Sequence, residues 1–114
     1  MTTYEDLPYQ ELSLDVWRDK YRFGDEASPA DTLTRVANAV SPGDTGLLDA
    51  LLTHKFVPGG RILAGLGTTR KVTFSQCYVI PSPEDSMEGI LHTLGEYALT
   101  LKAGGGVGFN ISTL

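Results

Sequence analysis

The longest apolar periodicity in the chain is the sequence feature that most restricts its fold. Between Ser86 and Lys102, apolar side chains recur at helical spacing and form one continuous stripe: Met87, Ile90, Leu91, Leu94, Tyr97, Ala98 and Leu101. This pattern predicts an amphipathic helix over residues 86–102. The glycines of "AGGGVGF" should end this helix, and a second strand is expected over Gly108–Ser112.

A first strand is predicted before this helix, in "TFSQCYVI" (Thr73–Ile80), because β-branched and aromatic residues are concentrated there. Alternation along a strand would put Cys77 on a face of small side chains, with Thr73, Ser75 and Val79. The opposite face would carry the larger side chains of Phe74, Gln76, Tyr78 and Ile80. We expect the large face to pack under a helix and the small face to border a pocket.

The N-terminal half is predicted to be helical. Residues 1–13 are expected to form an extended lead-in, followed by a short helix over Leu14–Phe23. Three Ser-Pro-x-Asp segments indicate helix starts, because serine is a favoured N-cap and proline fits the first helical turn. They lie at Ser28–Asp31, Ser41–Asp44 and Ser82–Asp85, and the first two predict helices near Pro29–Val40 and Pro42–Lys55.

Composition excludes several function classes. The chain has 114 residues and is 41% hydrophobic, which suits one modest globular domain. Its formal net charge of -5 argues against binding to nucleic-acid phosphates and gives no reason for attraction to an anionic membrane. A single cysteine excludes an internal disulfide framework. The acidic start "MTTYEDLPYQ" lacks the apolar core of a signal peptide, so a cytoplasmic location is expected.

Few residues offer chemistry, and each has a structural alternative. Cys77 is either a buried structural thiol or a redox thiol whose partner lies on another polypeptide. The glycines of "KAGGGVGF" either end a helix or bring backbone N–H groups to a phosphate. Asp85 and Ser86 either cap the long helix or bind a sugar hydroxyl or a base. The spacing of Glu88, His92 and Glu96 would allow a metal, but we interpret them as a solvated helix face and expect no metal site.

Several motifs in the same order resemble a known enzyme family. "PGGRILAGLGT", "FSQCYVI", "EDSMEGI" and "LKAGGGVGFNISTL" resemble the N-terminal part of the large catalytic subunit of ribonucleotide reductases, most closely the class II type that depends on adenosylcobalamin. The family's fold is a ten-stranded α/β barrel preceded by helices. The resemblance thus implies an α+β fragment with a helical region over residues 1–55. The start of the barrel, a strand, a crossover helix and a second strand, would span residues 56–114.

The resemblance also implies roles for individual residues. Cys77 matches the redox cysteine of the first strand, which reduces the ribose together with a second cysteine. The substrate loop and the substrate-facing glycine turn match Gly59, Gly60 and Gly106, and Gln76 matches a position near the substrate. Asp85 and Ser86 match the start of the site for a deoxynucleotide effector.

The other parts of such an enzyme would lie outside this sequence. The radical cysteine, the partner redox cysteine and most of the cobalamin site are expected on a C-terminal remainder supplied by a partner chain. A thioredoxin-like or other dithiol would reduce the disulfide. Three alternatives stay open: a non-catalytic nucleotide-binding or regulatory module, a fragment of a class I reductase, and an inactive remnant.

Overall fold

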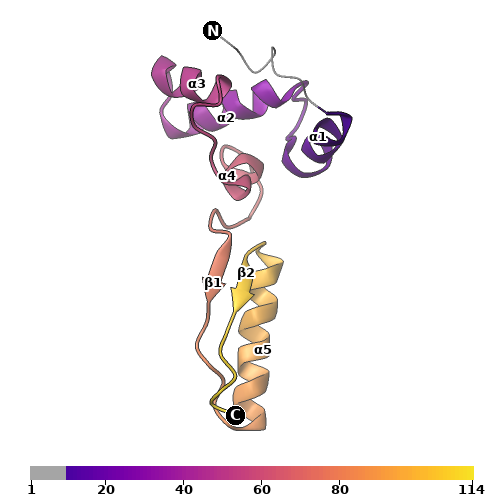
Figure 1. Ribbon diagram of the computed structural model, residues 1–114, viewed down its shortest axis with the longest axis vertical. Coiled ribbons are helices and arrows are strands. Elements are labelled where there is room, and N and C mark those ends of the chain that lie inside the picture. The colour runs from indigo at the N-terminus through magenta and orange to yellow at the C-terminus, as the bar shows by residue number, and fades with distance from the viewer. Residues whose placement is uncertain (1–9) are drawn as a thin grey trace. The chain divides into compact units, whose positions relative to one another are not determined.

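The computed structural model describes residues 10–114. The chain divides after Arg70 into two compact units (Figure 1). We call residues 10–70 the helical unit and Lys71–Leu114 the β–α–β unit. Residues 56–70, which the resemblance assigned to the start of the barrel, belong by their contacts to the helical unit.

The helical unit contains four short α-helices and one π-helical turn. The elements are α1 (Glu11–Val16), the π turn η2 (Trp17–Tyr21), α2 (Pro29–Val40), α3 (Thr45–Leu52) and α4 (Gly60–Gly65). The prediction for α2 is confirmed at both ends. The Asp31 carboxylate accepts the backbone N–H groups of Ala27 and Ser28 at 2.8 and 3.0 Å, which satisfies donors at the helix start.

The other two Ser-Pro-x-Asp segments do not begin a helix at their serine. Helix α3 starts at Thr45, and the Asp44 carboxylate caps it by accepting the Leu47 N–H at 3.0 Å. The segment turns first, because Gly43 has a φ of +80° that ends any helical path from Pro42. The predicted start near Pro42 is therefore wrong, and the aspartate takes the capping role.

Two further expectations for the helical unit are wrong. Part of the extended lead-in expected over residues 1–13 lies outside the described residues, and from Glu11 onward the chain is helical. The glycine-rich segment at Gly59 and Gly60, which the resemblance matched to a substrate loop, contains the helix α4. Ile62 and Leu63 of α4 pack against the core, so tertiary packing outweighs the low helix propensity of glycine there.

The core of the helical unit lies between α2 and α3. It consists of Leu33, Val36 and Ala37 from α2 and Leu51 from α3. Beside it, Arg35 makes an ion pair with Glu26, with 2.6 Å between Nε and Oε1. The same guanidinium donates to the carbonyl of Leu63 at 2.8 Å and to that of Leu66, so it fastens α4 to α2.

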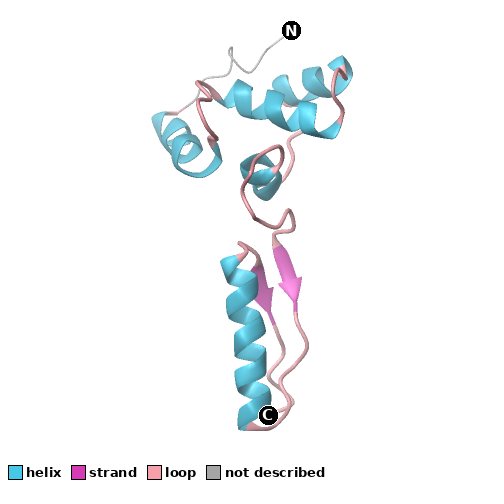
Figure 2. Ribbon diagram, turned by 180° about the vertical axis from the view of Figure 1, so that it is seen from behind, coloured by secondary structure: helices cyan, strands magenta, loops and turns pink. Residues whose placement is uncertain are grey.

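The β–α–β unit confirms the predicted order of strand, helix and strand. It contains β1 (Cys77–Val79), α5 (Met87–Lys102) and β2 (Gly106–Gly108), and Figure 2 shows both strands alongside α5. The strands are parallel, with Cys77 opposite Gly106 and Val79 opposite Gly108. The predicted strand bounds are wrong: β1 is shorter than Thr73–Ile80, and the second strand begins at Gly106 instead of Gly108.

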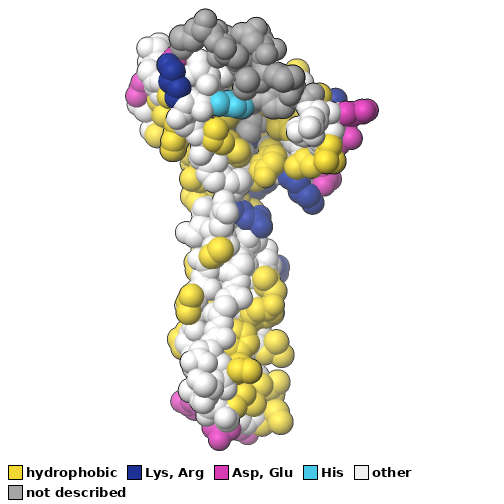
Figure 3. All heavy atoms as spheres, viewed as in Figure 1, with side chains coloured by type: hydrophobic (Ala, Val, Ile, Leu, Met, Phe, Trp, Pro, Cys, Tyr) yellow, Lys and Arg dark blue, Asp and Glu magenta, His cyan; other side chains and the backbone are white. Residues whose placement is uncertain are grey.

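This unit leaves most of its apolar side chains in solvent. Of its residues, all of which the structure describes, those classed as buried are Pro83, Thr93 and Gly105. Tyr78 of the expected large face is half-buried, but Phe74 remains 50% exposed. Figure 3 shows hydrophobic side chains gathered along this unit, and the most exposed ones include Val79, Met87, Leu91, Leu94, Leu99 and Ile111. Their exposure is the main difference from an ordinary folded core.

No helix within residues 10–114 has the length and apolar character needed to cross a lipid bilayer.

Candidate functional site

Three of the predicted site residues meet at the start of the two strands. Cys77 of β1 lies opposite Gly106 of β2 in the register of the sheet. The Gly106 N–H donates to the backbone carbonyl of Gln76 at 2.7 Å. The predicted redox strand and the predicted glycine turn are therefore direct neighbours.

Cys77 is a free and exposed thiol. The alternative of a buried structural cysteine is therefore wrong for the chain as described. An exposed thiol can be approached by another molecule, which both nucleophilic attack and disulfide formation require. Gln76, directly before β1, is also exposed.

The glycine turn has a clear structural role. Gly104 has a φ of +93° directly after α5, and the Gly105 N–H donates to the Thr100 carbonyl at 3.1 Å. These are the features of a helix C-terminus closed by a left-handed glycine. The interpretation as a helix end is confirmed, and the turn leads immediately into the strand beside Cys77.

Gly105 explains why β2 can pair so close to the helix. A Cβ at this position would lie 2.6 Å from Cε2 of Tyr78, well inside van der Waals contact. The Tyr78 hydroxyl is hydrogen-bonded to the Thr73 hydroxyl, which restrains the ring. Only glycine fits between this ring and α5, so Tyr78 and Gly105 set the position of Gly106 next to Cys77.

Asp85 and Ser86 lie at the other end of the unit from the start of β1 (Figure 1). The Ser86 hydroxyl oxygen accepts the Gly89 N–H at 3.0 Å, so Ser86 is the N-cap of α5. Asp85 is exposed. The capping interpretation is confirmed for Ser86, and the candidate effector residues do not adjoin the thiol.

The predicted substrate-loop glycines belong to the helical unit. Gly59 precedes α4 and Gly60 is its first residue. A Cβ on Gly60 would lie 3.1 Å from the Tyr21 hydroxyl oxygen, so the close approach observed at this glycine is to a side chain of the same unit.

The polar face of α5 carries one ion pair. His92 Nε2 lies 3.6 Å from Oε1 of Glu96, and the His92 side chain is 76% exposed. Across residues 10–114, no three His, Cys, Asp or Glu side chains are grouped closely enough to hold a metal ion.

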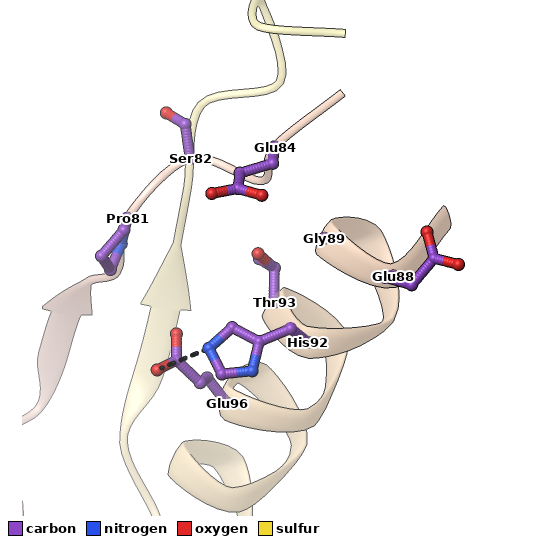
Figure 4. A pocket seen from close by; sticks show the side chains of 8 residues that line it. All are labelled: Pro81, Ser82, Glu84, Glu88, Gly89, His92, Thr93 and Glu96. Atoms are coloured by element: carbon purple, nitrogen blue, oxygen red, sulfur yellow. Dashed lines mark ion pairs between the residues drawn. The ribbon is translucent and has the colours of Figure 1, made fainter. Parts of the chain in front are cut away.

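Sequence reasoning missed a pocket beside this polar face. Its volume is about 360 Å³, and it lies between the loop that follows β1 and one side of α5 (Figure 4). Glu84 from the loop and Thr93 and Glu96 from the helix line it. The signal available in the sequence was Gly89, one turn before Thr93, where the absence of a side chain lets the loop approach the helix.

Part of the chain matches a known protein family. Residues 75–114 match the family model of the ribonucleotide reductase barrel domain. The matched stretch contains β1, α5 and β2 with their connections. No curated protein matches the chain. Over residues 75–114, the chain is thus similar to the barrel domain of ribonucleotide reductase.

Proposed function

We propose that this chain is the N-terminal part of a class II ribonucleotide reductase, active when another polypeptide completes its barrel. The assembled enzyme would reduce ribonucleotides to deoxyribonucleotides. One observation carries the proposal: the stretch that matches the reductase barrel folds as parallel β1–α5–β2 and presents an exposed thiol beside a glycine turn.

In this proposal Cys77 is one of two reducing thiols. A thiyl radical on the completing chain removes the 3′-hydrogen of the ribose and later returns it. Cys77 and a second thiol together supply two electrons and two protons. The C2′–O bond breaks, the hydroxyl leaves as water, a C2′–H bond forms, and the two sulfurs end as a disulfide. A thioredoxin-like or other dithiol reduces that disulfide by exchange. A cytoplasmic location, where thiols are kept reduced, suits this chemistry.

The need for a completing chain is supported by what the β–α–β unit leaves uncovered. Parallel sheets in proteins are normally covered on both faces and extended by further strands. Here the sheet has two strands, and Val79 at the end of β1 is 90% exposed. Leu91 and Leu94 of α5 are 57% and 55% exposed. Covering these side chains with the remainder of a barrel would remove them from water.

The proposed cofactor, adenosylcobalamin, is assigned to the completing chain. Gln76, Cys77 and Gly106 are all exposed, so these residues by themselves do not bury a group as large as a corrin ring. When bound to the assembled enzyme, the cofactor would supply the radical. The role of this chain would be to hold the Cys77 thiol on a paired strand.

Binding roles are proposed for the remaining predicted residues. Gly59, Gly60, Gln76 and Gly106 would border the substrate, where small or backbone groups leave room for a nucleotide. Asp85 and Ser86 would bind the deoxynucleotide effector. Ser86 keeps its hydroxyl proton for a ligand, because the capping bond uses only its oxygen as acceptor.

A non-catalytic nucleotide-binding or regulatory module is the second candidate. The position of Asp85 and Ser86 at the opposite end of the unit from Cys77 favours it, because an effector could bind there without the thiol. Nucleotide binding by this chain alone, unchanged by substitution of Cys77, would be its signature.

Reconstitution tests the proposal. The chain is mixed with a polypeptide that carries the rest of a class II reductase, together with adenosylcobalamin, a dithiol and a ribonucleotide, and deoxyribonucleotide is measured. Product should require both chains and should disappear with Cys77→Ser. Ser75→Ala is the matched control, since Ser75 is exposed two residues before Cys77 and has no redox chemistry. Product formation by the Cys77→Ser mixture would contradict the role of the thiol.

A further inference from the structure

The pocket beside α5 has features of a binding site that the proposed reductase function does not use. Figure 4 shows the Glu84 carboxylate and the Thr93 hydroxyl pointing toward one another across it. No hydrogen bond joins these two groups, so space remains between them. The volume of the whole pocket, about 360 Å³, lies in the range of small-ligand sites.

Thr93 is the observation that points to a ligand. It is only 5% exposed, yet no described group is a hydrogen-bond partner of its hydroxyl. Two other helical threonines, Thr34 and Thr100, each donate to the carbonyl four residues earlier, at 2.8 Å. Every fully occluded polar side-chain atom within residues 10–114 has a partner, so the Thr93 hydroxyl is not fully enclosed, and Figure 4 shows it directed into this pocket. A hydroxyl that is held in place by a largely buried side chain, faces a pocket and has no protein partner is available to hydrogen-bond a ligand.

The fold holds the loop over Thr93. A Cβ on Gly89 would lie 2.7 Å from the Glu84 carbonyl oxygen, so glycine is what lets the loop rest on the helix. The Thr113 hydroxyl donates to the Pro83 carbonyl at 2.6 Å and fixes the same loop from the C-terminal segment. The position of Glu84 is therefore set by the fold.

The lining selects a ligand that is positively charged and donates hydrogen bonds. The carboxylates of Glu84 and Glu96 border the pocket, whereas that of Glu88, which also lines it, points away from its centre (Figure 4). The only basic lining group, His92, already faces Glu96 at 3.6 Å. The carboxylates are too dispersed to enclose a metal ion, since no group of three potential metal ligands occurs among the described residues. An ammonium group carries up to three N–H donors and can reach acceptors that do not converge on one point.

We propose that this pocket binds the primary ammonium group of an organic amine. The Glu84 carboxylate supplies the opposite charge and accepts one N–H, and the Thr93 oxygen accepts another. The amine is either a free aliphatic diamine or the side chain of a lysine. This site uses neither Cys77 nor the Asp85 and Ser86 pair, so it stands independently of the reductase proposal.

Titration of the full ¹⁵N-labelled chain at low ionic strength tests the proposal. One arm adds 1,4-diaminobutane, a second adds N-acetyl-lysine methylamide, and a third adds tetramethylammonium, a cation with no N–H donor. The backbone amide signals of Gly89 and Thr93 are followed by NMR. Saturable shifts are expected with at least one of the first two probes and not with the third. Tighter binding of the diamine would identify a free amine as the source, and tighter binding of the lysine derivative a protein side chain.

Variants then locate the contacts. Glu84→Gln should weaken binding on the order of tenfold, because it removes a charge-assisted hydrogen bond. Thr93→Val, of nearly equal size, should weaken it severalfold. Glu88→Gln is the matched control, since this carboxylate points away from the pocket centre in Figure 4, and it should leave the affinity within about twofold. Absence of saturable shifts, equal binding of tetramethylammonium, or an equal loss with Glu88→Gln would overturn the proposal. If Thr93→Val does not fold, the comparison of the three probes on the unaltered chain still tests the proposal.

Discussion

Replacing Glu26 with glutamine should strongly destabilise the helical unit. Its Oε1 lies 2.6 Å from Nε of Arg35, and Oε2 accepts from the Thr32 hydroxyl at 2.6 Å and from the Phe23 N–H at 3.1 Å. The Glu26 and Arg35 side chains are only 10% and 12% exposed. Glu26→Gln keeps the shape and one acceptor oxygen, but it removes the charge that neutralises Arg35. It also places an NH2 donor where a carboxylate oxygen accepts from Arg35 or from Thr32 and Phe23. Removing one partner of a buried ion pair costs about 3 kcal/mol in the free energy of unfolding.

The single tryptophan reports this change directly. Trp17 is 7% exposed, and its Nε1 donates to the Thr32 hydroxyl at 2.8 Å, next to Glu26 in the same network. Urea unfolding followed by Trp17 fluorescence therefore measures the helical unit. Asp49→Asn is the matched control, because the Asp49–Lys55 pair is solvent-exposed and should be worth no more than about 0.5 kcal/mol. The reasoning is refuted if Glu26→Gln and Asp49→Asn shift the free energy of unfolding equally.

Three further predictions concern glycines, acid and an unpartnered hydroxyl. Gly105→Ala should destabilise the β–α–β unit by about 2 kcal/mol, because its Cβ would meet the Tyr78 ring, whereas Gly95→Ala, with nothing within 4 Å, should stabilise α5 by up to about 1 kcal/mol. Hydrogen exchange of the Ile80 amide, which donates to the Gly108 carbonyl, should distinguish the two, and protection rising in both variants would contradict the steric argument. Burial raises the pKa of Glu26, but hydrogen bonds from Arg35, Thr32 and Phe23 outweigh it, so this pKa lies below 4.5. The stabilisation is thus complete above pH 4.5 and lost as the pH falls through the lowered pKa, and urea unfolding of Glu26→Gln should lose this part of the pH dependence. Thr93→Val should not lower the melting temperature, because the hydroxyl has no protein partner to lose.

Local sequence predicted the parts of the fold that are governed by local interactions. The helix α2 was predicted correctly because Ser28, Pro29 and Asp31 act within one turn, as N-cap, first helical residue and acceptor of N-terminal N–H groups. The helix α5 was predicted to within a residue because its start is a serine cap and its end a left-handed glycine. Both signals depend only on neighbours along the chain.

Predictions that depend on distant contacts were less accurate. Helix α4 was missed because Ile62 and Leu63 become helical through packing against α2 and α3, which the glycine-rich sequence does not reveal. The strand bounds were wrong because pairing depends on how closely β2 approaches β1, and the Tyr78–Gly105 contact sets that approach. The buried Glu26–Arg35 pair joins residues on different segments and has no local signature.

The sequence by itself determined the helix caps, the strand–helix–strand order and the presence of one thiol in the first strand, because these follow from residue type and short-range spacing. Only the tertiary structure decided that the strands are parallel, that Cys77 is exposed and lies opposite Gly106, and that Thr93 opens into a pocket under Glu84. These depend on how a loop or turn returns to a helix or strand, and the closest approaches occur at Gly89 and Gly105, where a side chain would leave no room for the facing group.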